Sequence, residues 1–114
     1  MKNYSYYIGI LKTLLENKGV KLDLYSFDLP KDIAGRCDYK NSLIMLNTKS
    51  AYQALITLAH EGGHWVSYLD KKSDGIKYSV EEREKFANEY GYKLIQEIGA
   101  DKLITKEIWD NENE

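Results

Sequence analysis

The chain has little of several residue types, and each shortage limits the class of protein it can be. Its 114 residues include one cysteine, Cys37, so no disulfide can form within the chain and a reducing cytoplasm is the simplest setting. No apolar run is long enough to span a bilayer, and the first residues lack the apolar segment of a signal peptide. The net charge is −2, with lysine and arginine spread along the chain, so a basic stripe for nucleic acid is missing. We therefore expect a cytoplasmic protein that binds neither membranes nor nucleic acid directly.

Histidine is also scarce, and the two histidines lie in one short segment, His60-Glu61-Gly62-Gly63-His64. Residues four apart lie on the same face of a helix, so His60 and His64 can direct two imidazoles to one point, as a tetrahedral zinc ion requires. Glu61 is rotated away from them and can reach a water on the metal. The pattern H-E-x-x-H is typical of zinc peptidases, in which the glutamate is the general base.

A simpler interpretation is a pair of histidines at the surface, or bonded to backbone carbonyls. The flanking residues argue against it, because they form an apolar stretch that we expect to be buried. The stretch consists of Ala54, Leu55, Leu58, Ala59, Trp65, Val66 and Leu69. Two buried imidazoles need polar partners, so a third ligand is expected elsewhere in the chain.

The order of apolar patterns and capping residues predicts an α+β domain with a small sheet. Helical spacing over residues 4–17 predicts an amphipathic helix, and alternation over residues 20–25 predicts a strand. Two short extended runs around Lys40–Ser42 predict a β-hairpin. Ser50 ends a group of capping residues before the histidine-bearing helix, and Ser79 begins a capping box before a second long helix.

The length fits one domain, which we assign to residues 1–109. Gly99–Asp101 is predicted to end the second long helix, and Asp101 to cap a short final helix. The final helix is expected to face the core with Leu103, Ile104, Ile108 and Trp109. Residues 110–114 are acidic and polar, and we predict that they form a disordered tail.

Glu84 is the expected third ligand. It completes a stripe of apolar or small residues on the second long helix that also contains Val80, Ala87, Gly91, Leu94 and Ile98. A carboxylate on a buried stripe must be paired or must coordinate a cation, and the two imidazoles await such a group. Pairing of Glu84 with Arg36 is the alternative. Asn88, one turn further on, is expected to hydrogen-bond an imidazole or the hairpin.

Gly62 and Gly63 are unusual inside a helix, where each costs about 1 kcal/mol relative to alanine. Close approach of another helix or of a substrate strand would explain them, and a bent or frayed helix is the alternative. We expect close packing.

Three stretches together resemble the ImmA/IrrE-type metallopeptidases, gluzincin-like proteases of bacteria and their mobile elements. Leu43–Asn47 is similar to the family's I-x-I/V-N strand, Leu55–His64 to F-T-L-A-H-E-L-G-H, and Glu84–Gly91 to E-x-x-A-N-x-F-A. The resemblance covers roughly residues 33–95. It implies a zincin-like fold, in which a small antiparallel or mixed sheet packs on the H-E-x-x-H helix and on a second helix that carries the glutamate ligand.

The resemblance also implies a site and an activity. His60, His64 and Glu84 would be ligands of Zn²⁺, and Glu61 the catalytic base. Family members often act on helix-turn-helix repressors, so the implied function is a zinc endopeptidase that cleaves a specific intracellular regulatory protein. A substrate strand is expected to pair with the sheet edge near residues 43–47. The candidates for an oxyanion-stabilising group are Tyr39, Tyr68, Tyr78 and Tyr92.

Two other functions are compatible with the residues. The first is a zinc-containing binding module that sequesters a regulatory or host protein without cleaving it. A structural zinc site of this kind needs a fourth protein ligand, for which Cys37 is the candidate. The second is a metal-free helical interaction domain, which would leave the position of Glu84 on its stripe unexplained.

Overall fold

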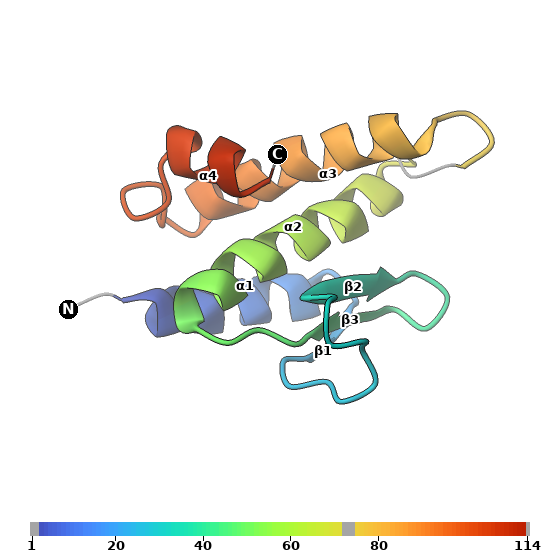
Figure 1. The fold of residues 1–114 in the computed structure, drawn as a ribbon. Helices are drawn as coiled ribbons and strands as arrows, with labels where there is room; N and C mark the ends of the chain where they lie inside the picture. Colours follow the sequence, from blue (N-terminus) through green and yellow to red (C-terminus); the bar gives the residue numbers. More distant parts are fainter. Residues whose placement is uncertain (1–2, 72–74, 114) are drawn as a thin grey trace.

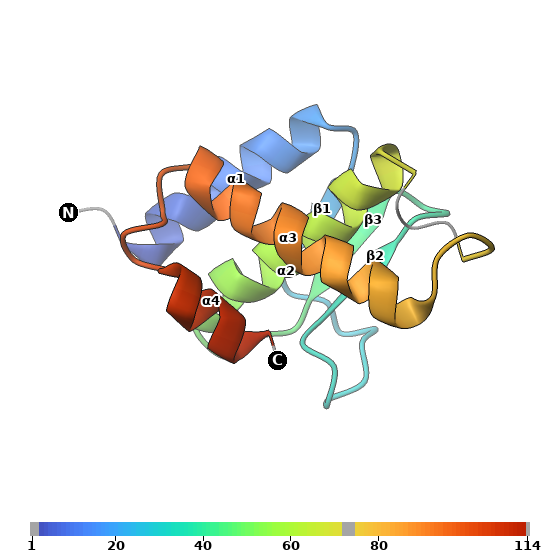
Figure 2. The ribbon, with the colours of Figure 1, turned by 90° about the horizontal axis from the view of Figure 1, so that it is seen from above.

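The computed structural model describes residues 3–71 and 75–113 of the chain, with the elements ordered as in Figure 1. They are α1 (Tyr4–Asn17), β1 (Lys21–Asp23), β2 (Gly35–Asp38), β3 (Leu43–Leu46), α2 (Ala51–Leu69), α3 (Val80–Glu97) and α4 (Lys106–Glu112). This confirms the α+β class. The two ribbon views show α2 running through the middle of the molecule, with α3 and α4 on one side and the sheet on the other (Figures 1 and 2).

The central helix α2 is positioned by its cap and its apolar side chains. The Ser50 hydroxyl accepts a hydrogen bond from the Gln53 amide at 3.1 Å, which confirms the predicted helix start. Leu55, Leu58 and Ala59 are fully buried and Trp65 is 4% exposed, so most of the apolar stretch around the histidines lies in the core as expected. The prediction is wrong for Leu69 at the end of α2, which is 48% exposed. Even α2, with 19 residues the longest helix, is not apolar enough to cross a membrane, and neither is any other helix of the described chain.

The sheet is mixed and has the order β1-β3-β2. β1 pairs with β3 in parallel and β2 pairs with β3 antiparallel, so the predicted hairpin is confirmed. β3 is the central strand, and its Ile44 and Leu46 are fully buried. The expected docking edge at residues 43–47 is therefore wrong, since β3 is paired on both sides. β1 and β2 are the two edge strands, and β2 packs against α2.

Close contact between α2 and α3 explains one of the two unusual glycines directly. A Cβ atom on Gly63 would lie 2.1 Å from the carbonyl oxygen of Ala87, and one on Gly91 would lie 2.8 Å from the carbonyl oxygen of Ala59. Each helix thus meets the backbone of the other at a glycine. The expectation of close packing is confirmed, and α2 continues without interruption to Leu69.

The C-terminal region differs from the prediction in the residue that caps the final helix. Gly99 has φ +80° and ends α3 as expected, but the cap of the final helix is Thr105 and not Asp101. The Thr105 hydroxyl accepts a hydrogen bond from the Ile108 amide at 3.3 Å. The segment before it remains close to the core because Ile104 is fully buried.

The predicted disordered tail is wrong for residues 110–112, which form the second half of α4. Trp109 is only 1% exposed and holds this helix against the core. The Tyr52 hydroxyl also donates a hydrogen bond to the Glu112 carboxylate at 3.0 Å, joining the end of α4 to α2. Glu114, the last residue of the predicted tail, lies outside the described residues.

Candidate metal centre

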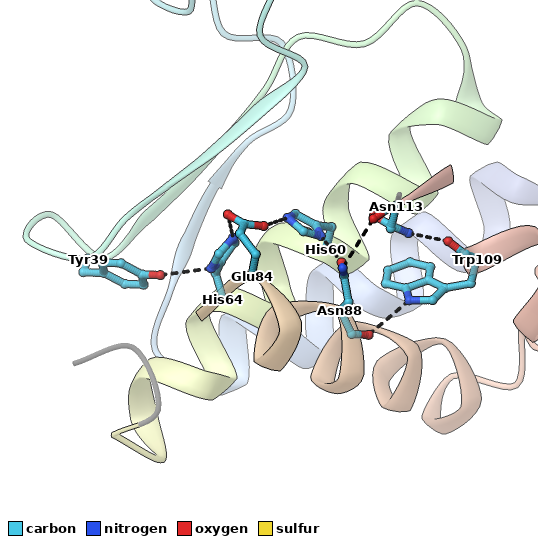
Figure 3. A network of polar contacts seen from close by, with 7 residues as sticks. All are labelled: Tyr39, His60, His64, Glu84, Asn88, Trp109 and Asn113. Atoms are coloured by element: carbon cyan, nitrogen blue, oxygen red, sulfur yellow. Dashed lines mark hydrogen bonds and ion pairs between the residues drawn. The ribbon is translucent and has the colours of Figure 1, made fainter. Parts of the chain in front are cut away.

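The three predicted ligands come together between α2 and the first turns of α3 (Figure 3). His60 and His64 lie one turn apart on α2, and both Nε2 atoms face the carboxylate of Glu84. Glu84 Oε2 is 3.2 Å from Nε2 of His60, and Oε1 is 3.2 Å from Nε2 of His64. Candidate ligand atoms of the three residues all lie within 4.8 Å of one another.

These separations fit a tetrahedral metal ion. Bond lengths of about 2.0–2.1 Å from zinc to nitrogen or oxygen, with tetrahedral angles, put neighbouring ligand atoms about 3.4 Å apart. The nitrogen–oxygen distances of 3.2 Å are close to this value. Two imidazoles and one carboxylate are also the ligand types of catalytic zinc sites, which keep one position for water or substrate.

The hydrogen bonds of His60 favour a cation at this point. Its Nδ1 atom lies 2.8 Å from the amide oxygen of Asn88, and its Nε2 atom faces a carboxylate oxygen of Glu84. A neutral imidazole carries one N–H and can satisfy only one of these two acceptors. Positive charge at Nε2 removes the conflict, either as a second proton or as a metal ion to which Nε2 offers its lone pair.

The Nδ1 atom of each histidine has a polar partner from a different part of the fold. The contact of His60 with Asn88 on α3 confirms the bond expected for that residue. The Tyr39 hydroxyl lies 3.2 Å from Nδ1 of His64, and the Tyr39 ring stacks on Tyr68 with centroids 4.7 Å apart. Partners of this kind orient metal-binding imidazoles. The role of Tyr39 behind His64 was missed in the sequence, where it was one of four equivalent tyrosine candidates.

The prediction that Glu84 lies on a buried stripe is wrong in one respect. Its side chain is 50% exposed, while those of His60 and His64 are 19% and 13% exposed. Close packing of α3 on α2 begins only at Ala87, so the preceding turn stands at the open side of the site. The alternative partner Arg36 forms no ion pair with Glu84 in the described structure, because both carboxylate oxygens face the imidazoles.

Glu61 lies beside the ligands in an environment that holds its proton. The residue is 8% exposed, and burial raises the pKa of Glu61 to about 7, helped by the negative charge of Glu84 and opposed by Arg36. A carboxyl group with a pKa near neutrality can both accept and return a proton. Burial also lowers the pKa of His64, although Glu84 opposes this shift, so the imidazole keeps the neutral form that binds metals.

A cleft of about 250 Å³ opens above the site, between the edge strand β2 and the ligands. It is lined by Gly35, Arg36, Cys37, Tyr39, His60, Glu61, His64 and Glu84. Of the four candidate tyrosines, Tyr39 is the one in this lining. Cys37 shares the cleft, but no metal-ligand cluster of the described residues includes it. Burial, with the charges of Glu61 and Asp38, raises the pKa of the Cys37 thiol to about 12, which keeps it protonated and a poor ligand.

The chain matches no protein-family model, no curated protein and no solved structure.

Proposed function

We propose that the protein is a zinc-dependent endopeptidase that cleaves a specific regulatory protein in the cytoplasm. The observation that carries the proposal is the Glu84 carboxylate held between the Nε2 atoms of His60 and His64, with the buried Glu61 beside them. The motifs similar to ImmA/IrrE-type metallopeptidases support it, and so does an α+β fold that agrees with a zincin-like domain.

In this proposal His60, His64 and Glu84 are the zinc ligands. Bound zinc would supply an acidic water and polarise the scissile carbonyl. Glu61 would be the group that takes a proton from such a water and gives it to the leaving amine. The exposed side of Glu84 leaves the centre open to a polypeptide from solvent.

The edge strand β2 is the surface on which we expect a substrate to lie. A substrate segment that adds to β2 as a further strand would use main-chain hydrogen bonds and run along the cleft past Glu61. Binding of this kind needs an extended segment, so the substrate is a protein with an accessible loop or linker. A transcriptional repressor with a flexible connection between domains is such a protein.

The alternative is a zinc-containing module that sequesters its partner without cleavage. A purely structural zinc site has four protein ligands as a rule. Within residues 3–71 and 75–113 the cluster has three, and all three line the cleft. The geometry therefore favours a site that binds water or substrate.

The first test is the metal content of tag-free protein. We expect about one zinc per chain, as for a single catalytic site, and a large loss of zinc in Glu84→Ala. Glu89→Ala is the matched control, because Glu89 is an exposed glutamate on the same helix. Absence of zinc in the wild type, with no uptake from added zinc, would refute the proposal.

The second test separates cleavage from binding. A peptide library digested from a bacterial proteome is incubated with wild type and with Glu61→Gln, and new termini are identified by mass spectrometry. We expect the variant to keep its zinc and to lose cleavage. Zinc binding by both proteins with no cleavage by either, and partner binding unchanged in the variant, would favour the sequestering module.

A further inference from the structure

Helix α4 is connected to the metal centre through Asn88 (Figure 3). The Asn88 amide oxygen faces Nδ1 of His60 at 2.8 Å, and the amide nitrogen donates to the backbone carbonyl of Asn113 at 3.4 Å. The Trp109 indole N–H donates to the backbone carbonyl of Asn88 at 3.1 Å. The Asn113 side chain donates to the carbonyl of Trp109 at 2.8 Å, which closes the network at the end of α4.

This network determines which way the Asn88 amide points. In the observed orientation the NH₂ group faces a carbonyl, that of Asn113, and the oxygen faces His60. The flipped orientation would bring the amide oxygen against the Asn113 carbonyl oxygen, two acceptors without a proton between them. The carbonyl at residue 113 therefore selects the orientation in which Asn88 presents an acceptor to His60.

The orientation of Asn88 in turn selects the tautomer of His60. An acceptor at Nδ1 requires the proton on Nδ1, and this leaves the lone pair on Nε2, the atom that faces Glu84. The flipped amide would donate to Nδ1 and move the proton to Nε2, where it would block metal binding. The position of the Asn113 carbonyl at the end of α4 thus determines whether Nε2 of His60 carries a lone pair or a proton.

We propose that the C-terminal end of α4 positions a ligand of the metal centre. The Asn113 carbonyl orients the Asn88 amide, and Asn88 holds His60 in the tautomer that binds metal. This inference rests on the proposed function, because it takes His60 as a metal ligand. Two features keep α4 in place. Trp109 is 1% exposed, and its ring lies where a Cβ atom on Gly91 would come within 2.7 Å of it, so α4 packs tightly on α3. Asn88 and Asn113 act as positioning residues and have no chemical step of their own.

The tautomer can be read directly in metal-free protein by ¹⁵N NMR of the imidazoles near pH 8.5, where histidine is neutral. The measurement uses the Glu84→Ala background, because the Glu84 carboxylate otherwise competes for the proton on Nε2. We expect the Nδ1–H form of His60 in this background. Adding Asn88→Ala, or ending the chain at Glu112 to remove the Asn113 carbonyl, should shift the population toward Nε2–H.

Zinc affinity, measured by competition with a chromophoric chelator, tests the consequence with Glu84 restored. Asn88→Ala should lower the affinity about 10- to 100-fold, as the loss of a histidine partner does in other zinc sites. Ending the chain at Glu112 should lower it about three- to tenfold, the effect of one weakened hydrogen bond. Asn111→Ala, at an exposed position of α4, is the control and should leave the affinity unchanged.

Asn88→Asp provides the sharpest comparison. A carboxylate offers His60 an acceptor in either orientation, but it also places an oxygen against the Asn113 carbonyl, so Asn88→Asp should bind zinc more tightly than Asn88→Ala and should not be weakened further by truncation at Glu112. Trp109→Phe removes the indole N–H together with the ring atoms that pack against Gly91, so it loosens α4 and checks the same link without shortening the chain.

The proposal would be overturned if truncation and Trp109→Phe lowered only the unfolding midpoint, with tautomer and zinc affinity unchanged. Truncation that weakened Asn88→Asp as much as wild type would also overturn it. Failure of the proposed function is distinguishable, because it appears as absence of zinc from the wild type, while the tautomer is measured without metal.

Discussion

Replacing Gly63 with alanine should test the contact that holds the two ligand-bearing helices together, and Gly62 next to it is a matched control. A Cβ atom on Gly63 would lie 2.1 Å from the carbonyl oxygen of Ala87 and 2.7 Å from the amide nitrogen of Gly91, both backbone atoms of α3. A Cβ atom on Gly62 would lie 3.0 Å from the side-chain ends of Leu15 and Leu94. Backbone atoms can yield only if a helix moves, whereas leucine methyl groups can rotate.

The magnitude follows from these distances. A separation of 2.1 Å must open to at least 3.0 Å, so Gly63→Ala must move α2 and α3 apart by about 1 Å. Overpacking of a core costs typically about 1–3 kcal/mol, and we expect the upper end because backbone is opposed. Alanine returns about 1 kcal/mol of helix propensity, so the free energy of unfolding should fall by about 2 kcal/mol. In Gly62→Ala the same gain in helix propensity offsets a smaller overpacking cost, so the free energy of unfolding should change little.

The same movement should weaken metal binding. Glu84 lies one turn before Ala87 on α3, so separating the helices draws its carboxylate away from the imidazoles of α2. Ligand atoms now 3.2 Å apart would approach 4 Å, beyond the spacing of about 3.4 Å that a tetrahedral zinc ion sets. We expect the zinc affinity of Gly63→Ala to fall at least about tenfold, the size of effect seen when ligand positioning is disturbed, and that of Gly62→Ala to stay as in wild type.

Urea unfolding in the presence of a chelator gives the stability of the metal-free proteins, and chelator competition gives the zinc affinity. If Gly63→Ala matched wild type in both, the helices would not be in contact at this glycine and the reasoning would be refuted. Equal losses of stability and zinc affinity in Gly63→Ala and Gly62→Ala would also contradict this prediction, since only Gly63 contacts the backbone of α3.

Three further predictions concern side chains of the cleft. Because burial raises the pKa of Glu61 to about 7 from the ordinary 4.5, folded metal-free protein keeps a proton that the unfolded chain loses, so this residue destabilises the fold increasingly as pH rises from about 4.5 to 7. Glu61→Gln should therefore raise the free energy of unfolding at pH 8 by up to about 3 kcal/mol, at about 1.4 kcal/mol per pKa unit, and should change it little at pH 4.5; equal effects at both pH values would contradict the burial argument. Burial raises the pKa of Cys37 to about 12 from the ordinary 9.0, which lowers its thiolate fraction at pH 8 about a thousandfold. The greater intrinsic nucleophilicity of this thiolate offsets part of the loss, so Cys37 should react with iodoacetamide about 30- to 50-fold more slowly than an exposed thiol. Alkylation at the ordinary rate, followed by mass spectrometry, would show that the thiol is not buried. Tyr39→Phe keeps the ring stacked on Tyr68 and removes the hydroxyl behind His64, so zinc affinity should fall about tenfold with little change in the unfolding midpoint, and an unchanged affinity would exclude a positioning role.

The sequence by itself determined the features that depend on neighbours along the chain. The predicted helix over residues 4–17 coincides with α1, and the predicted capping box at Ser79 is present at the start of α3. Local spacing also places His60 and His64 on one face of α2, because helix geometry alone brings residues four apart together. Periodicity selected Glu84 as their partner, although the burial that was expected for it is absent.

The tertiary structure decided the strand order, the orientation of the two imidazoles and the course of the last helix. No local pattern distinguishes a central strand from an edge strand when both are short, and β3 became central only through its pairing with β1. Tyr39 and His64 are 25 residues apart, and Asn88 and Asn113 are also 25 residues apart, so neither contact has a signal within either segment. Acidic, polar residues at 110–112 favour disorder when read alone, yet they form a helix because Trp109 buries its indole against α3. Contacts of this kind exist only after distant segments have packed, and in this protein they hold both histidines of the metal centre.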